Sequence, residues 1–153
     1  MSVSREQIVA EARDWLGTPW HHQAMVKGVG TDCIGLLAGV ALNTGIADAR
    51  AHMRDPRFKG YGREPLPDVL LAACEQYLDE IPIADAGLGD IFLLKVPRGR
   101  LPQHFAIVSR VADGKPSYML HATSAFPRCV VENGIDDQWW SRVLKAYRFK
   151  GVD

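Results

Sequence analysis

One cysteine in this sequence has a setting that favours nucleophilic chemistry. Cys33 follows Asp32, a good helix N-cap residue, and precedes apolar residues at helical spacing, so it is predicted to lie in the first turn of a helix. The helix dipole and the unpaired backbone N–H groups there would lower the pKa of the thiol. The alternative is packing, the commoner role of a free cysteine. Nearby glycines that permit close backbone approach favour the functional role: Gly28, Gly30 and Gly35.

A thiol nucleophile needs a base within hydrogen-bond reach, and histidine is the usual one. The chain offers five histidines: His21, His22, His52, His104 and His121. Two of them, His104 and His121, lie in runs of β-forming residues on either side of Asp113-Gly114, a strong signal for a two-residue hairpin. These two are therefore the best-placed candidates.

The hairpin predicts where the two histidines point. If Asp113-Gly114 is the turn, Ala112 faces Lys115, His104 faces Thr123 and Ala106 faces His121. Facing residues and alternate residues share one side of an antiparallel sheet, so His104 and His121 project from the same face, one diagonal step apart. Either histidine alone could be a strand residue bonded to a backbone carbonyl. Two on one face beside a helix-start cysteine favour a nucleophile, a base and an orienting third group.

Composition limits the classes of protein and partner. A chain of 153 residues is expected to form one domain, residues 1–153, and 47% hydrophobic with 24% charged residues is typical of a soluble globular protein. Eighteen basic and eighteen acidic residues give no net charge, which argues against nucleic acid or an anionic membrane as partner. Three widely spaced cysteines fit neither a disulfide framework nor a zinc site: Cys33, Cys74 and Cys129.

The first residues bear on where the protein is made. The segment MSVSREQIVAEARDW is polar and amphipathic, so no secretory signal is expected. No apolar stretch is long enough to span a bilayer. We expect a protein made in the cytoplasm, which an assembly containing it could export.

The first half of the chain is predicted to be helical. A capping box at Ser4 and Gln7 starts a helix with Ile8, Ala12, Trp15 and Leu16 on its apolar stripe, ending at Gly17. A loop from Pro19 to Thr31 leads to the second helix, which runs from Cys33 to Asn43 and Gly45. Residues 46–64 form a long polar connection. A third helix from Pro67 to about Leu78 has its buried stripe at Val69, Leu70, Ala73 and Tyr77.

The second half is predicted to form strands. Five short runs are rich in β-forming residues: Ile91–Val96, His104–Val111, Tyr118–Ala122, Cys129–Glu132 and Val143–Phe149. Helices followed by strands indicate an α+β fold with N-terminal helices packed on a C-terminal antiparallel sheet of about five strands. The helical half has too few apolar residues to close its own core, so the two halves must pack on each other.

Five stretches stand in order along nearly the whole chain: GTPWHHQAMVKGVGTDCIGLL, GLGDIFLL, HFAIVS, LHATSAFPRCVVE and WWSRVLKAYRF. The Gly-x-Asp-Cys-x-Gly core of the first is the most specific. Together they resemble the NlpC-type peptidoglycan peptidase family and its phage-associated cell-wall peptidase branch. The resemblance implies a papain-like α+β fold in which Cys33 is the nucleophile, His104 the general base and His121 the residue that orients the imidazole. It also implies hydrolysis of amide bonds in the stem peptides of the bacterial cell wall, with no metal or organic cofactor.

Four further residues are candidates for oxyanion or substrate binding: Trp20, His21, His22 and Asp32. Family members commonly carry a tyrosine ahead of the cysteine, and its hydroxyl serves the oxyanion hole. This chain has Trp20, whose indole N–H can donate a hydrogen bond but is shaped differently. His21 and His22 fall in the loop expected to border the cleft. Asp32 could contact substrate, although N-capping accounts for it fully.

The remaining functional residue types have plainer interpretations. Asp90 matches a Gly-Asp pair of the family and is expected to tie down the entry to a strand. Cys74 and Cys129 are expected to be packing residues, and His52 a surface residue. Trp139 and Trp140 could form a sugar-stacking platform, but two adjacent residues cannot both face one way, so at least one is expected in the core.

Three functional hypotheses follow. The first is a thiol peptidase or amidase that acts on peptidoglycan as part of a phage tail or tail-like particle, with tail-tip proteins as partners. The second is a non-catalytic tail-assembly or wall-binding protein on the same fold. The third is a cysteine acyltransferase or deamidase, which would use the same nucleophile. The intact set of Cys33, His104 and His121 favours the first.

Overall fold

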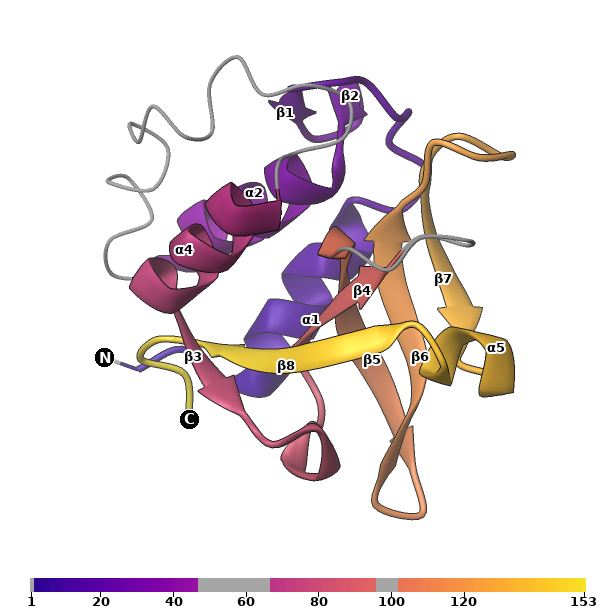
Figure 1. The fold of residues 1–153 in the computed structure, drawn as a ribbon. Helices are drawn as coiled ribbons and strands as arrows, with labels where there is room; N and C mark the ends of the chain where they lie inside the picture. Colours follow the sequence, from indigo (N-terminus) through magenta and orange to yellow (C-terminus); the bar gives the residue numbers. More distant parts are fainter. Residues whose placement is uncertain (1, 47–66, 96–101) are drawn as a thin grey trace.

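The computed structural model of the chain describes residues 2–46, 67–95 and 102–153 (Figure 1). Helices α1, α2 and α4 pack against one face of a six-stranded sheet, so the predicted α+β architecture is confirmed. His52 and residues 47–64 of the predicted connection lie outside the described residues.

Helix α1 (Arg5–Asp14) begins at the predicted capping box. The Gln7 N–H donates to Ser4 Oγ at 3.1 Å, and the Ser4 N–H donates to Gln7 Oε1 at 2.8 Å. The prediction that Leu16 lies on the buried stripe is wrong, because Leu16 is 44% exposed. The helix ends at Asp14, so helical spacing no longer applies at Leu16.

Helix α2 (Cys33–Thr44) runs through the centre of the molecule. All residues from Ile34 to Ala41 are buried, and Gly45 ends the helix in the left-handed region at φ +82°, as the sequence predicted. Gly39 allows α2 to approach α1 closely, because a Cβ atom there would lie 2.3 Å from Trp15 Cζ2. The position of α2 is therefore determined by packing along nearly its whole length.

Helix α4 (Pro67–Tyr77) has the predicted extent, one residue shorter at its end. Ala73 of the predicted stripe is buried, as is the neighbouring Cys74. Tyr77 is half-buried. The side chains of Val69 and Leu70 lie outside the described residues.

A sixth strand is the main departure from the predicted sheet. Strand β3 (Leu78–Ile81) follows α4 directly and pairs antiparallel with β8 (Val143–Phe149). Its central residues, Asp79 and Glu80, are exposed and each pairs with a lysine at 3.1 Å. Charged residues have low β-propensity, so this strand depends on the neighbouring strand and its ion pairs rather than on its own sequence.

The sheet is antiparallel throughout, with strand order β3-β8-β4-β5-β6-β7. Its four remaining strands are β4 (Ile91–Lys95), β5 (Pro102–Ala112), β6 (Lys115–Ala122) and β7 (Val130–Gly134). All five predicted strands are present, with ends that differ by a few residues. Two short helical segments were not predicted: η2 (Ile83–Asp85) and α5 (Asp137–Trp140).

The segment from Pro19 to Thr31, predicted as a loop, contains a small hairpin. Strand β1 (Met25–Val26) pairs with β2 (Gly30–Thr31). Gly28 has φ +79° in the turn and no atom within 4 Å of an added Cβ, so it serves the turn rather than the predicted close approach. This hairpin lies at the top of Figure 1, and the β6–β7 connection lies at its upper right.

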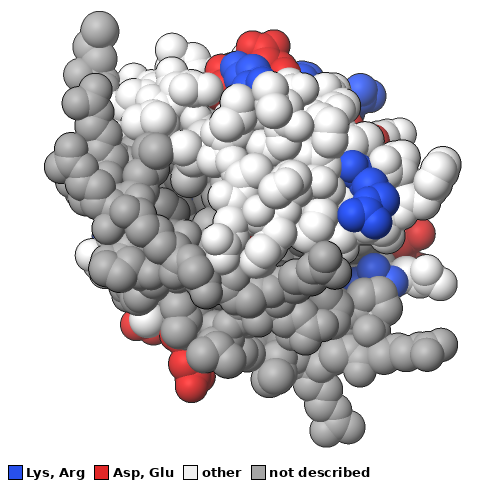
Figure 2. All heavy atoms as spheres, turned by 90° about the horizontal axis from the view of Figure 1, so that it is seen from above, with Lys and Arg blue, Asp and Glu red and all other residues white. Residues whose placement is uncertain are grey.

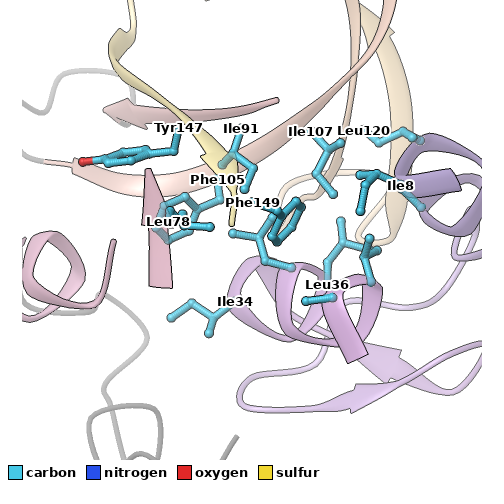
Figure 3. Packing of buried hydrophobic residues seen from close by; sticks show 14 of the residues in the cluster. Ile8, Ile34, Leu36, Leu78, Ile91, Phe105, Ile107, Leu120, Tyr147 and Phe149 are labelled. Carbon is cyan, nitrogen blue, oxygen red and sulfur yellow. The ribbon is translucent and has the colours of Figure 1, made fainter. Parts of the chain in front are cut away.

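Buried residues form two clusters on opposite faces of the sheet. The larger lies between the helices and the sheet, where Ile8 and Leu36 meet Ile107 and Leu120 (Figure 3). Alternate strand residues point the other way, and the second cluster includes Phe92, Leu94, Ala106, Val108, Met119 and Ala146. Trp139 and Trp140 pack against this second cluster, so the sheet is covered on both faces.

The end of the molecule that carries the β1–β2 hairpin has few charges in its described part. Seen from above in Figure 2, its surface is mostly uncharged, with lysines, arginines and acidic residues scattered around the rim. The even distribution agrees with the balanced composition.

We expect the Gly39→Ala substitution to lower the free energy of unfolding by about 1–3 kcal/mol, because the added methyl group would force Trp15 out of its packed position. Urea unfolding followed by tryptophan fluorescence measures the change. Gly134→Ala is the matched control, since a Cβ there meets no atom closer than 3.9 Å. Equal stability of the two variants would contradict close packing of α1 on α2.

Candidate active site

Cys33 is the first residue of α2, and its position is fixed by the N-cap. Asp32 Oδ1 accepts the Gly35 N–H at 2.8 Å, and Oδ2 accepts the Gln23 N–H at 2.8 Å. Asp32 is buried, so the predicted N-cap role is confirmed and both carboxylate oxygens are bound to backbone. That arrangement ties the loop before the helix to its first turn.

Gly35 brings the same loop even closer. A Cβ atom at this position would lie 2.1 Å from the Ala24 carbonyl oxygen, so the first turn of α2 and the β1–β2 segment can pack only around a glycine. Gly30 is nearly as tight, with an added Cβ at 3.0 Å from His21 Cβ. The close approach predicted for this pair of glycines is confirmed.

The Cys33 thiol reaches the strand that carries His104. The backbone of Phe105, the residue after His104, is near enough to the Cys33 sulfur to lower the pKa of the thiol. Cys33 packs on the helix-side cluster, whereas His104 shares its side of β5 with Ala106 of the other cluster. Cys33 therefore lies on the helix side of β5, and His104 projects from its other side.

The predicted lowering of the Cys33 pKa is wrong. Burial, together with the nearby Asp32 charge, raises the pKa of the thiol to about 12. Backbone hydrogen bonds from Phe105, Ile34 and Cys33 itself act in the opposite direction, as expected at a helix start. They are outweighed, because removal of water penalises the thiolate more than these donors stabilise it. At neutral pH Cys33 carries its proton.

The hairpin that positions the histidines has the predicted turn and register. Asp113 has φ +53° and Gly114 φ +73°, as a type I′ turn requires. The pairing shifts by one residue at Arg110, which lies opposite Tyr118. The predicted register returns at Val108, opposite Met119, and continues at Ile107, opposite Leu120. This is the register that the predicted alignment of His104 and His121 requires.

His104 and His121 are in direct contact. His104 Nε2 lies 2.8 Å from His121 Nδ1, with the two rings 5.0 Å apart and nearly perpendicular. The prediction that they project from one face of the sheet is confirmed. His104 is half-buried and His121 is 3% exposed, so His104 is the more accessible of the two.

Asn133 extends this pair, and sequence reasoning missed it. Its Oδ1 lies 2.5 Å from His121 Nε2, and its Nδ2 donates to the Gly134 carbonyl at 3.0 Å. Asn133 is opposite Met119 in the β6–β7 ladder, one residue beyond the predicted end of that strand. Only the β6–β7 register could have revealed it, and no turn signal in the sequence gives that register.

Burial keeps both imidazoles neutral. Burial, with smaller contributions from His121 and Arg142, lowers the pKa of His104 to about 3. Burial also lowers the pKa of His121, against the hydrogen bond to Asn133, which raises it. Neither ring carries a proton charge at neutral pH.

An aromatic side chain packs against His121. The ring of Trp139 lies 5.2 Å from that of His121, edge to face. Arg142 stacks on the same tryptophan, with Cζ 4.6 Å from the ring centroid. Trp140 packs edge-on against Phe92 at 5.4 Å. Both tryptophans are half-buried at the edge of the same cluster, so the expectation that at least one lies in the core is not met.

Trp20, His21 and His22 line the loop that leads to Cys33. Trp20 is anchored by its N–H to the Arg128 carbonyl at 2.8 Å, and its ring stacks on that of His22 at 6.4 Å. His21 is exposed, with Nδ1 3.1 Å from the His22 carbonyl.

The residues expected to be structural behave as such. Asp90 is 1% exposed and pairs with Arg148 at 2.8 Å and Arg5 at 3.2 Å, which ties α1 and β8 to the entry of β4. Cys74 is buried, as predicted for a packing residue. Cys129 is half-buried and lies just before β7, not within a strand as predicted.

The described residues also bear on metal binding and on membrane spanning. No group of three or more histidine, cysteine, aspartate or glutamate side chains there could hold a metal ion. None of the helices described has the length and apolar character needed to cross a membrane.

Comparison with known proteins establishes the fold. No protein-family model and no curated protein sequence matches the chain. The solved NlpC/p60 domain of the peptidoglycan hydrolase SagA matches with a TM-score of 0.59 and 22% identity, covering 95% of this chain and 98% of that one. An NlpC/p60 family protein from Bacillus cereus ATCC 10987 matches with a TM-score of 0.66 and 16% identity, covering 97% of this chain.

A lipoprotein-like NLP/P60 family protein from Staphylococcus aureus Mu50 matches over 95% of this chain, with a TM-score of 0.61 and 17% identity. This chain spans only 41% of the length of the Bacillus and Staphylococcus proteins. At these identities the likeness concerns the fold. The chain therefore has the α+β, papain-like fold of NlpC/p60 domains.

Proposed function

We propose that this protein is a cysteine peptidase or amidase that hydrolyses amide bonds in the stem peptides of peptidoglycan. The observation that carries the proposal is the hydrogen-bonded series His104–His121–Asn133, whose first member lies next to Phe105, the β5 residue whose backbone acts on the Cys33 thiol. The fold supports the same substrate, since SagA, which shares it, is a peptidoglycan hydrolase.

The hydrogen bonds assign a proton to each ring nitrogen. Because the Asn133 amide N–H donates to Gly134, its Oδ1 can only accept, and His121 Nε2 must carry the hydrogen. A neutral His121 then accepts at Nδ1, so His104 donates from Nε2. His104 Nδ1 is left with a free lone pair, which is the state that a general base requires.

The reaction starts from a neutral thiol and a neutral imidazole. As the Cys33 sulfur attacks the substrate carbonyl carbon, His104 Nδ1 takes the thiol proton, and the imidazolium keeps its Nε2 hydrogen bond to His121. The backbone N–H of Cys33 and the indole N–H of Trp20 are the proposed donors to the oxyanion.

Collapse of the tetrahedral intermediate completes the cycle. The C–N bond breaks, the imidazolium gives its proton to the leaving amine, and a thioester remains on Cys33. Water, losing a proton to His104, attacks the thioester and restores the thiol with release of the carboxylic acid. An acyltransferase would differ only in using another acceptor at this step.

We extend the proposal to a phage tail or tail-like particle as the setting in which the protein acts, with tail-tip proteins as partners. The support is the resemblance of its motifs to the phage-associated branch of the family. The balanced charge and the mostly uncharged described surface in Figure 2 favour peptide and protein partners over nucleic acid.

Cleavage of purified peptidoglycan, followed by mass spectrometry of the released fragments, tests the proposed reaction. We expect Cys33→Ala and His104→Ala each to lower the rate by a factor of about 10⁴ or more, since each removes a reacting group. Cys129→Ser is the matched control, because Cys129 has no place in the reaction. Undiminished cleavage by the Cys33 variant would refute the mechanism, and a lack of cleavage by the intact protein would favour the wall-binding hypothesis.

The protonation state of Cys33 can be measured by alkylation with iodoacetamide, quantified on the Cys33 peptide by mass spectrometry. With the pKa raised to about 12, the thiolate fraction grows about tenfold per pH unit below that value. We therefore expect the rate to rise steadily from pH 6 to 9 without a plateau. A rate that is already constant below pH 7 would show a thiolate-imidazolium pair instead.

The role assigned to Asn133 predicts different effects for two substitutions. Asn133→Leu removes the acceptor that fixes the His121 tautomer, so we expect kcat/KM to fall about ten- to a hundredfold. Asn133→Asp keeps an acceptor and adds a negative charge, which favours the imidazolium. We expect it to retain activity and to move the acid limb of the pH profile upward. Equal pH profiles for the two variants at equal stability would contradict the role.

A further inference from the structure

We propose that Arg142, stacked on Trp139, binds a carboxylate of the substrate peptide next to the amide bond that is cleaved. The inference rests on the proposed function and adds to it a determinant of substrate choice. It assigns a role to a cation that the reaction mechanism leaves unused.

Arg142 is held beside the histidine pair by a continuous series of contacts. The Trp139 ring lies 5.2 Å from the His121 ring, and the Arg142 guanidinium lies 4.6 Å from the same tryptophan. Only one ring thus separates the guanidinium from His121. The positive charge of Arg142 is also felt at His104, where it lowers the pKa of the imidazole.

The backbone around Arg142 is fixed. The side chain of Asp136 caps α5 by accepting the Trp139 N–H at 2.9 Å. The Arg142 N–H donates to the Trp139 carbonyl at 2.9 Å, and the Arg142 carbonyl accepts the Lys95 N–H at 2.9 Å. Arg142 is therefore attached to both α5 and the end of β4, and it is preorganised for binding.

Arg142 has no carboxylate partner in the described part of the chain, unlike most arginines described. Arg5 and Arg148 pair with Asp90, while Arg13 and Arg110 pair with Glu132. Arg110 is the informative comparison, because it stacks on Tyr118 at 4.7 Å and is satisfied by Glu132 at 3.5 Å. Arg142 has the same stacking on an aromatic ring without the acid.

A stacked guanidinium keeps its planar donors free for a carboxylate, which it can bind through two parallel hydrogen bonds. Stem peptides carry free carboxylates, so the expected ligand chemistry is present on the proposed substrate. A substrate carboxylate paired with Arg142 would also neutralise the positive charge of Arg142, which lowers the pKa of His104. A substrate with the carboxylate would thus bind more tightly and ease proton transfer from Cys33.

Two forms of one substrate test the proposal. A peptide released from peptidoglycan that retains the cleavable bond is used with its carboxylates free, or converted to carboxamides with carbodiimide and ammonia. We expect the intact protein to prefer the free acid about ten- to a hundredfold in kcat/KM. Arg142→Gln should lose this preference, because its kcat/KM should fall for the free-acid substrate and stay unchanged for the carboxamide. Arg142→Lys should retain part of the preference.

Arg110→Gln is the matched control, and it should keep the full preference. Binding to the Cys33→Ala protein, measured by calorimetry with and without Arg142→Gln, gives the same comparison without turnover. Equal cleavage of acid and amide by the intact protein would overturn the role of Arg142 and leave the proposed function standing. An equal fall in the kcat/KM of Arg142→Gln on the acid and the amide would also overturn the role of Arg142. Failure of the intact protein to cleave either form would overturn the proposed function and this inference with it.

Discussion

The burial of α2 between α1 and the sheet is the constraint on which the site depends. Residues Ile34 to Ala41 are all buried, so the helix cannot shift without disrupting the core. Cys33 immediately precedes this segment in the same helix, so its backbone position is fixed as well. Asp32 and Gly35 then hold the preceding loop against the first turn, through two backbone hydrogen bonds and the absence of a side chain. The nucleophile is thus positioned by packing rather than by a partner in the reaction.

The histidines are positioned by a different means, the register of one hairpin. Asp113 and Gly114 have the positive φ values of a type I′ turn, and this turn sets the pairing of β5 with β6. Register decides which face each side chain occupies, so a slip by one residue would place only one of the two histidines on the reacting face. The site therefore joins a helix fixed by the core to a pair of strands fixed by a turn.

The cap of α2 and the turn of the β5–β6 hairpin explain which parts of the site could be predicted from the sequence. Helix caps and two-residue turns have local signatures, so Cys33 at the helix start and the shared face of His104 and His121 were predictable. Strand β3 was not, because its charged centre is stabilised by a strand distant in sequence. Asn133 was missed for the same reason: its contact with His121 depends on the β6–β7 register, and that connection has no short turn.

The direction of the Cys33 pKa shift was mispredicted for another physical reason. A helix start acts on a thiol over a single turn and can be recognised from neighbouring residues. Desolvation depends on everything that packs around the sulfur, including β5, which lies far away in the sequence. Local signals could therefore reveal the stabilising donors of the helix start but not the burial that outweighs them.

A neutral resting site has consequences for selectivity. A standing thiolate reacts with many electrophiles and is readily oxidised, whereas a protonated thiol is much less reactive. Here burial favours the uncharged forms of both Cys33 and His104, so charge separation must develop while a carbonyl group is in place. The hydrogen bonds from His104 through His121 to Asn133 orient the base before that moment and need no rearrangement when the proton moves. Reactivity in such a site depends on how the substrate binds, which gives the residues around the histidine pair influence over which peptides are cleaved.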